Sequence, residues 1–269
     1  MRISRGIRTY HQFDGPTVVI EHKRESVSIG SWITLNHFSI VEIMADVGFD
    51  WLCIDMEHSV TDYFEAQQLI ASIQSGGMRA FVRVGENNAR IIKRVLDAGA
   101  EGIIVPMVNS RQDARHAVEA SKYPPKGKRG VGLARAQKYG FGFEEYSRRE
   151  ADRITVIAQI EHIDAINNLE DIITQDGIDG TIIGPYDLSG SLGKPGRYDD
   201  DVQGALLRYE TIGRRFSKPI GFHVIQPDYN LVLRKIEKGY RFIAFSLDTL
   251  FLGTLCRQQM QLLKGAKTE

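Results

Sequence analysis

From residue 27 onward, short apolar runs alternate eight times with longer amphipathic segments. Continuous apolar runs of this length are typical of parallel strands that helices cover from outside. Eight such units predict an α/β fold, and they favour a closed (β/α)8 TIM barrel over an open, doubly wound sheet. The runs cover residues 27–33, 51–54, 80–84, 102–106, 155–160, 180–183, 219–224 and 242–245. The amphipathic segments cover residues 40–47, 63–75, 89–98, 112–121, 163–175, 201–216, 229–238 and 249–263.

The chain length of 269 residues suits one barrel, which usually takes about 250 residues. No Gly-x-Gly-x-x-Gly motif follows the first run, which argues against a dinucleotide-binding fold. The first 26 residues are polar and lack the alternation. We therefore predict an N-terminal arm or extra element over residues 1–26 and a single barrel over residues 27–269.

Charge and cysteine content exclude some classes of protein. Lys plus Arg and Asp plus Glu number 34 each, so no basic excess indicates a nucleic-acid partner. No stretch approaches the ~20 consecutive apolar residues of a membrane span. Cys53 and Cys256 stand in apolar surroundings, without the spacing of a zinc site or a disulfide framework. We expect buried, reduced thiols in a cytoplasmic protein that binds neither nucleic acid nor membrane.

One segment interrupts the alternation. Residues 122–153 contain two prolines and five glycines. A loop of this length inside a compact domain is more often functional than idle. Because it comes after the fourth predicted strand, we expect it at the end of the barrel where active sites form.

Polar residues gather where the predicted strands end, which is where (β/α)8 barrels place their chemistry. Two carboxylates on neighbouring strand ends, Glu161 and Asp187, would repel each other unless a cation lay between them. Their hard oxygen atoms suit Mg2+ or Mn2+. The alternative is that both carboxylates are solvated, or that Asp187 caps the helix that follows it.

Three more residues lie at this end, and two of them admit two interpretations each. Arg83 needs an anionic partner, which is either a substrate carboxylate or developing enolate, or a structural salt bridge to Asp55 or Glu57. His58, three residues after Asp55, resembles a base with its orienting carboxylate, although a lone histidine is usually structural. His223 lies in the seventh run, and nothing in its spacing assigns it a role.

The position of the lysines narrows the chemistry further. A Schiff-base aldolase needs a desolvated lysine inside the barrel. No lysine lies within the eight runs, and Lys218 only precedes the seventh. The sequence therefore disfavours imine chemistry and favours an enolate that a metal ion stabilises.

Several motifs appear together in an order that is highly specific. The run GFDWLCIDMEH at residues 48–58 resembles the signature of the HpcH/HpaI aldolase family, the metal-dependent class II pyruvate aldolases. Further segments match in order at residues 82–84, 92–100, 105–108, 123–132, 159–161 and 183–189. The resemblance covers about residues 28–260. It implies a barrel of the phosphoenolpyruvate/pyruvate superfamily, with the last helix swapped onto a neighbouring subunit, in hexamers built as trimers of dimers.

The resemblance also implies roles for individual residues. Glu161 and Asp187 match the family's metal ligands, for Mg2+ first and for Mn2+ or Co2+ as alternatives. Arg83 matches the arginine that holds the oxo oxygen and stabilises the enolate. His58 and Asp55 match the pair linked to proton transfer. The remaining matches are Asp97, which reaches that pair from the adjacent subunit, and Gln159, which lines the pyruvate pocket.

The same resemblance implies that the backbone amides of Tyr186 and Asp187 hold the pyruvate carboxylate at a helix start, a suitable place for an anion. This chain departs from the family at the mouth of the site. Tyr186 stands where relatives commonly have a small residue, and Met56 where they commonly have Gly. These departures bear on which aldehyde is used rather than on the chemistry.

The function that the resemblance implies is reversible aldol cleavage of a 4-hydroxy-2-oxo acid to pyruvate and an aldehyde. Alternatives form the same metal-bound enolate but differ in what it reacts with. They are oxaloacetate decarboxylases and citrate-synthase-like or macrophomate-synthase-like enzymes. A non-catalytic barrel that only binds a ligand is a third possibility, and it would require altered metal ligands. Glu161, Asp187 and Arg83 are all present, which disfavours it.

Overall fold

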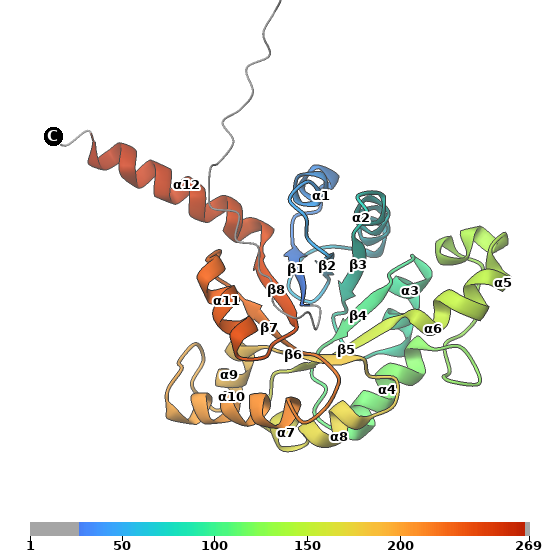
Figure 1. The fold of residues 1–269 in the computed structure, drawn as a ribbon. Helices are drawn as coiled ribbons and strands as arrows, with labels where there is room; N and C mark the ends of the chain where they lie inside the picture. Colours follow the sequence, from blue (N-terminus) through green and yellow to red (C-terminus); the bar gives the residue numbers. More distant parts are fainter. Residues whose placement is uncertain (1–26, 267–269) are drawn as a thin grey trace, which may run out of the picture.

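The computed structural model describes residues 27–266 and contains a closed barrel of eight parallel strands, each paired with the next and the eighth with the first (Figure 1). The predicted (β/α)8 barrel is therefore confirmed, while the predicted arm lies outside the described residues. The strands are β1 (Ser28–Ile33), β2 (Trp51–Asp55), β3 (Arg79–Arg83), β4 (Gly102–Val105), β5 (Thr155–Ile160), β6 (Gly180–Ile183), β7 (Ile220–Val224) and β8 (Phe242–Leu247).

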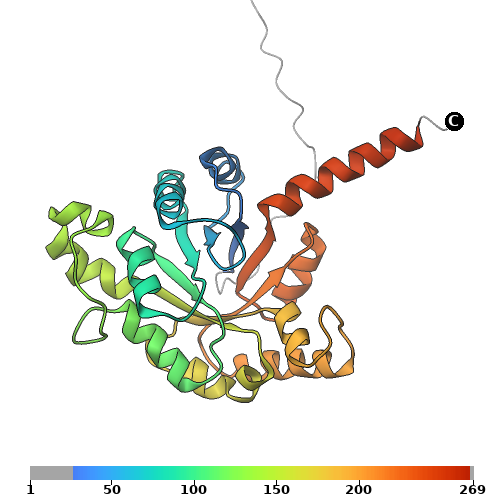
Figure 2. The same cartoon turned by 180° about the vertical axis from the view of Figure 1, so that it is seen from behind.

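Helices surround the barrel on its outside (Figures 1 and 2). The predicted segment 163–175 divides into two helices at Asn168, whose φ of −101° and ψ of 11° are not helical. None of the described helices is long and apolar enough to cross a membrane. The helices are α1 (Phe38–Ala45), α2 (Tyr63–Ser75), α3 (Ala89–Asp97), α4 (Arg111–Ser121), η1 (Arg135–Gly140), α5 (Phe143–Glu145), η2 (Tyr146–Glu150), α6 (Ala151–Arg153), α7 (Ile163–Asn167), α8 (Leu169–Thr174), α9 (Pro185–Ser191), α10 (Asp200–Gly213), α11 (Tyr229–Glu237) and α12 (Asp248–Gly265).

Alternation along each strand separates two apolar cores, because successive side chains point to opposite faces. The larger core lies between strands and helices and includes Leu52 and Ile54 of β2. The smaller core fills the barrel interior with the large rings of Trp51, Phe81 and Phe242. The rings of Trp51 and Phe242 stack with centroids 4.4 Å apart. These rings close the middle of the barrel, so a ligand can enter only from one of its ends.

The same alternation carries polar side chains inward beyond the apolar layer. Cys53 and Asp55 follow Trp51 at intervals of two residues on β2, and Arg83 follows Phe81 on β3. On β5 the inward series runs from Ile157 through Gln159 toward Glu161, just past the strand. The carboxyl end of the barrel therefore receives charged groups from neighbouring strands.

The predicted place of segment 122–153 is wrong. The segment follows α4 and precedes β5, so it belongs to the amino-terminal end of the barrel, opposite the polar strand ends. It packs there against the end of α3, where Arg129 forms an ion pair with Asp97 at 2.6 Å and Arg135 donates to the carbonyl of Ala98. Gln137 is fully buried within the segment. Within one chain, this segment is a packed structural unit.

Helix α12 extends away from the barrel in both views (Figures 1 and 2). Every residue from Leu255 to the end of α12 is exposed, including Cys256, for which the prediction of a buried thiol is wrong. Cys53 is fully buried, as predicted.

Beside the start of α12 lies an apolar groove of about 650 Å³. Side chains of α1, β8 and α12 line this groove, including Ile40, Ile43, Met44, Phe245, Phe251 and Leu252.

Candidate functional site

A buried ion pair joins β2 and β3 at the carboxyl end of the barrel. Asp55 and Arg83 are direct partners in the strand register, so the ladder itself brings them together. Arg83 donates from Nε to Asp55 Oδ1 at 3.0 Å and from Nη2 to Asp55 Oδ2 at 2.6 Å. Burial alone would raise the pKa of Asp55, but the hydrogen bonds and charge of Arg83 outweigh it and hold that pKa below its ordinary value. The sequence left open whether Arg83 pairs with a substrate or with Asp55 or Glu57. The structure contains the salt bridges to both carboxylates.

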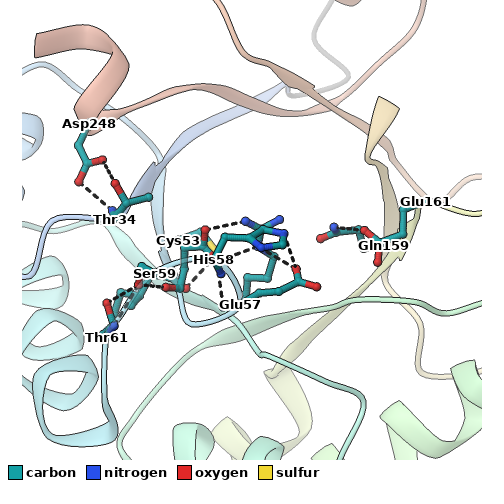
Figure 3. Close-up of polar contacts among 12 residues, drawn as sticks. Thr34, Cys53, Glu57, His58, Ser59, Thr61, Gln159, Glu161 and Asp248 are labelled. Carbon is teal, nitrogen blue, oxygen red and sulfur yellow. Dashed lines mark hydrogen bonds and ion pairs between the residues drawn. The ribbon is translucent and has the colours of Figure 1, made fainter. Parts of the chain in front are cut away.

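His58 does not contact the Asp55 carboxylate through its ring. Asp55 Oδ1 instead accepts hydrogen bonds from the backbone amides of Glu57 and His58, at 3.0 and 3.1 Å. The imidazole Nε2 lies 3.7 Å from Glu57 Oε2, and 61% of the His58 side chain is exposed (Figure 3). Asp55 therefore shapes the turn that presents His58, and the predicted side-chain pairing of the two is not formed within the chain.

Glu161 stands on the opposite side of the mouth, directly after β5 (Figure 3). The backbone amide of Met107 donates to Glu161 Oε1 at 2.7 Å, and the Gln159 amide donates to Oε2. Met107 has a φ of 52°, an unusual left-handed conformation for a side chain of its size. The loop after β4 thus accepts local strain to aim an amide at the carboxylate.

Asp187 approaches Glu161 from the first turn of α9. A Cβ atom added to Gly184 would lie 3.4 Å from both Asp187 Oδ2 and Glu161 Oε2. The two carboxylate oxygens consequently face one small space and lie no further apart than twice that distance. Only glycine leaves this space open, so the residue before α9 is part of the site.

Burial and neighbouring negative charge raise the pKa values of two carboxyl groups at the mouth, Glu161 and Glu57. Burial first, then the charge of Glu57, raises the pKa of Glu161 to about 7. Burial likewise raises the pKa of Glu57 to about 7, and the charges of Asp55 and Asp187 add to that effect. Glu57 Oε2 is buried and has no hydrogen-bond partner. The mouth therefore holds more negative charge than Arg83 alone can balance.

The residues present fit a divalent cation. Oxygens of Glu161 and Asp187 converge on the space beside Gly184, and a cation there would relieve the repulsion that raises the neighbouring pKa values. Among residues 27–266, no group of three or more His, Cys, Asp or Glu side chains is arranged to hold a metal. Two carboxylates would leave positions for water and substrate, which is how Mg2+ is commonly held.

The remaining predicted residues lie in different places. Gln159 is buried at the site, with Oε1 unpartnered. Tyr186 lines the pocket, is 51% exposed, and meets the ring of Tyr198 edge-on at 6.2 Å. Asp97 ends α3 near the opposite end of the barrel, where it binds Arg129. One chain therefore does not bring Asp97 to His58.

Two residues at the site have no functional role assigned from the sequence. Glu57 Oε2 lies 3.4 Å from Arg83 Nε, which is the structural salt bridge that the sequence predicts as one alternative. His223 lines the same pocket as Arg83, Gln159 and Asp187. A usable signal existed for His223, because it occupies an inward position of β7. No pattern indicates the burial of Glu57, which lies beyond the end of β2.

The model of the HpcH/HpaI aldolase/citrate lyase family matches residues 28–252. The chain belongs to this family. A hydroxypyruvate/pyruvate aldolase of Sagittula stellata is 37% identical, over 84% of this chain and 89% of that protein. A 2-dehydro-3,6-dideoxy-6-sulfogluconate aldolase of Pseudomonas putida is 35% identical, over 90% of this chain and 95% of that protein. The crystal structure of a family member from Burkholderia cenocepacia superposes with a TM-score of 0.84 at 32% identity, over 89% and 95% of the two chains.

Replacing Glu161 with Gln should stabilise the chelator-treated protein at alkaline pH. The folded-state pKa of about 7 exceeds the ordinary 4.5, so wild-type stability falls as pH rises through this interval, while the variant has no charge to bury. We expect Glu161→Gln to raise the Tm by roughly 3–8 °C at pH 8 and by far less below about pH 4.5. Differential scanning calorimetry in EDTA measures this, with the exposed Glu144→Gln as control. An equal or lower Tm at pH 8 would contradict the electrostatic account.

Proposed function

We propose that the chain is a metal-dependent lyase that cleaves a 4-hydroxy-2-oxo acid to pyruvate and an aldehyde, and that runs the reverse addition. The observation that supports this most directly is the convergence of Glu161 and Asp187 beside Gly184, in a pocket that Arg83 also lines. The relatives from Sagittula stellata and Pseudomonas putida are named aldolases. None of the eight strands contains a lysine, so no inward strand position offers an imine-forming amine.

Arg83 has the position and the restraint that enolate stabilisation needs. It lines the pocket, its guanidinium lies 4.4 Å from the centroid of the Trp32 ring, and Asp55 fixes its plane through two hydrogen bonds. A charge held in place before the reaction needs no reorganisation when the oxyanion develops. A bound divalent cation would supply further positive charge at that oxyanion. Glu161 and Asp187 would hold the cation, with Mg2+ first and Mn2+ or Co2+ as alternatives.

The substrate's other contacts follow from the pocket wall. Tyr186 and Asp187 belong to the first turn of α9, whose backbone amides have no partners within the helix and suit the carboxylate of the 2-oxo acid. Gln159 lines the pocket with Oε1 unpartnered. His58 is the exposed base at the mouth, and in cleavage it would take the proton from the substrate's hydroxyl.

The proposed reaction is tested by pyruvate release. With Mg2+ present, the purified protein should form pyruvate from a 4-hydroxy-2-oxo acid, which a lactate dehydrogenase coupled assay detects. EDTA should abolish the activity, and Mg2+, Mn2+ or Co2+ should restore it. Full activity after thorough chelation would refute the metal assignment. Oxaloacetate consumption without aldol cleavage would instead favour the decarboxylase or citrate-synthase-like alternatives.

Substituting Arg83 by Lys should impair the chemistry more than the fold. Lysine keeps a positive charge near Asp55 but loses the two-pronged contact that positions the guanidinium. We expect kcat/KM for pyruvate formation to fall about 10²–10³-fold. The matched control is Arg79→Lys, at the opposite end of the same strand, which should change kcat/KM less than about threefold. Unchanged activity in Arg83→Lys, with native circular dichroism, would remove Arg83 from the mechanism.

We also propose that the chain forms a homo-oligomer through α12. The apolar groove between α1 and the start of α12 is open, while α12 presents exposed apolar side chains such as Leu255 and Leu262. An α12 from a second copy has the apolar surface to fill that groove. Asp97 could then act from the adjacent subunit, as the family resemblance implies.

Light scattering after size exclusion should give a mass several times the 30.3 kDa of one chain, six times for a trimer of dimers. The paired change Leu255→Asp and Leu262→Asp, seven residues apart on one helix face, should lower that mass. The paired change Thr254→Asp and Gln261→Asp adds the same charge at the same spacing and should leave it unchanged. A wild-type mass of one chain, or an unaffected leucine variant, would contradict assembly through α12.

A further inference from the structure

A second pocket lies at the amino-terminal end of the barrel, opposite the mouth of the candidate site. It encloses about 800 Å³ and is lined by the first residues of two strands, Arg79 of β3 and Thr155 of β5. Segment 122–153 contributes further lining residues, among them Arg135. Because the apolar rings inside the barrel close its middle, this pocket is separate from the candidate site.

Cationic side chains outnumber anionic ones around this pocket. Of the described residues that line it, four carry a positive charge and two a negative charge, which leaves an excess of two positive charges. They are Arg79, Arg135, Lys138 and Arg153, with Glu101 and Glu150. A concave surface with one sign of charge in excess raises the local concentration of counter-ions. The pocket is therefore suited to an anion.

Two of these arginines donate only to neutral acceptors. Arg79 Nη2 donates to the Thr155 hydroxyl at 2.8 Å and to the Glu101 carbonyl at 3.3 Å. Arg135 Nη1 donates to the Ala98 carbonyl at 3.1 Å. Within residues 27–266, neither guanidinium forms an ion pair with a carboxylate. A guanidinium has five N–H donors, so most of the donors on both side chains remain for a ligand.

The two carboxylates of the pocket have other partners. Glu101 Oε2 accepts hydrogen bonds from the backbone amide of Ala80 at 3.0 Å and from Gln74 Nε2 at 3.3 Å. Glu150 forms an exposed ion pair with Arg153 at 3.7 Å. Neither carboxylate pairs with the two arginines that have neutral partners, so the charge of these arginines stays available to a ligand.

The backbone around the pocket is shaped to hold these side chains. Gly99 has a φ of 107°, and a Cβ atom there would lie 2.4 Å from Arg135 Nη1, so glycine leaves the room that this guanidinium occupies. Lys138 and Tyr139 follow each other with φ values of 53° and 58°, which is unfavourable for residues with side chains. The amide of Tyr139 donates to the Ala134 carbonyl at 2.9 Å and fixes this turn. Backbone strain of this kind is concentrated at active sites and ligand-binding sites.

The size and the aromatic lining of the pocket indicate an organic ligand rather than a bare ion. Its volume of about 800 Å³ lies within the range of about 300–1,000 Å³ in which proteins bind small organic molecules. The rings of Tyr139, which is 64% exposed, and of the buried Tyr146 line it beside the charged groups. The planar fork of arginine matches the oxygen atoms of a phosphate group.

We propose that this pocket is a second binding site, and that it takes a small phosphorylated metabolite whose phosphate group is held by Arg79 and Arg135. A phosphomonoester carries a charge of about −1.5 to −2 at pH 7, which matches the excess of two positive charges. The ring of Tyr139 offers a surface for the organic part. The proposal does not depend on the lyase activity, because it uses no residue of the mouth.

Isothermal titration calorimetry tests the site with AMP and glycerol 3-phosphate, and with adenosine, glycerol and orthophosphate as controls. EDTA in the buffer prevents the phosphates from binding through a metal ion at the mouth. At least one phosphomonoester should bind with one site per chain and more tightly than orthophosphate, and the two uncharged controls should not bind. Arg79→Gln and Arg135→Gln should each weaken that binding about tenfold. The matched control is the pair Arg208→Gln and Arg215→Gln, which removes exposed positive charge elsewhere and should leave the affinity unchanged.

Several outcomes would overturn the proposal. One is that the folded wild-type protein binds neither phosphomonoester, and another is that it binds orthophosphate equally well. Binding that Arg83→Lys abolishes, but that Arg79→Gln and Arg135→Gln retain, would place the ligand at the mouth and refute the second site. If circular dichroism shows that an arginine variant does not fold, Lys138→Gln on the exposed turn should still weaken binding, and an unchanged affinity in that variant would contradict the proposal.

Discussion

The ion pair between Asp55 and Arg83 is the contact on which the candidate site depends. Both residues face the barrel interior, and the parallel register of β2 and β3 makes them direct partners. Removing one member of a buried, hydrogen-bonded pair costs about 3–5 kcal/mol, so the pair holds the guanidinium firmly in the pocket. Trp32 lies against that guanidinium and His223 against Trp32, which extends the restraint across the mouth from β3 through β1 to β7.

The remaining charges at the mouth are left without similar compensation. Arg83 is committed to Asp55, while burial and the negative charges nearby, including that of Asp187, raise the pKa values of Glu57 and Glu161. Such a cluster lowers the stability of the metal-free protein and increases the gain when a cation binds. The same carboxylates thus lower the stability of the metal-free protein and raise its affinity for a cation. Such a trade-off between stability and function is common at active sites.

Most of the fold could be predicted because strand and helix periodicities are local properties of the sequence. The predicted and observed limits of β5 and β6 are identical, and the other strands differ by two residues or fewer at either end. The predicted position of segment 122–153 was wrong because α4 separates the segment from β4 and returns the chain to the amino-terminal end of the barrel. The course of α12 is not a local property: its amphipathic pattern indicates an apolar face but not which surface covers that face.

The position of a site residue could be predicted where it follows from its place on or just after a strand, as for Arg83 and Glu161. The contacts of a site residue could not be predicted where neighbouring residues compete for the same hydrogen-bonding atoms. Asp55 precedes His58 at a suitable spacing, yet Arg83 and two backbone amides occupy its oxygens, so the imidazole remains exposed. His223 shows the same limit, since its place in β7 does not reveal that its Nε2 remains without a hydrogen-bond partner among the described residues.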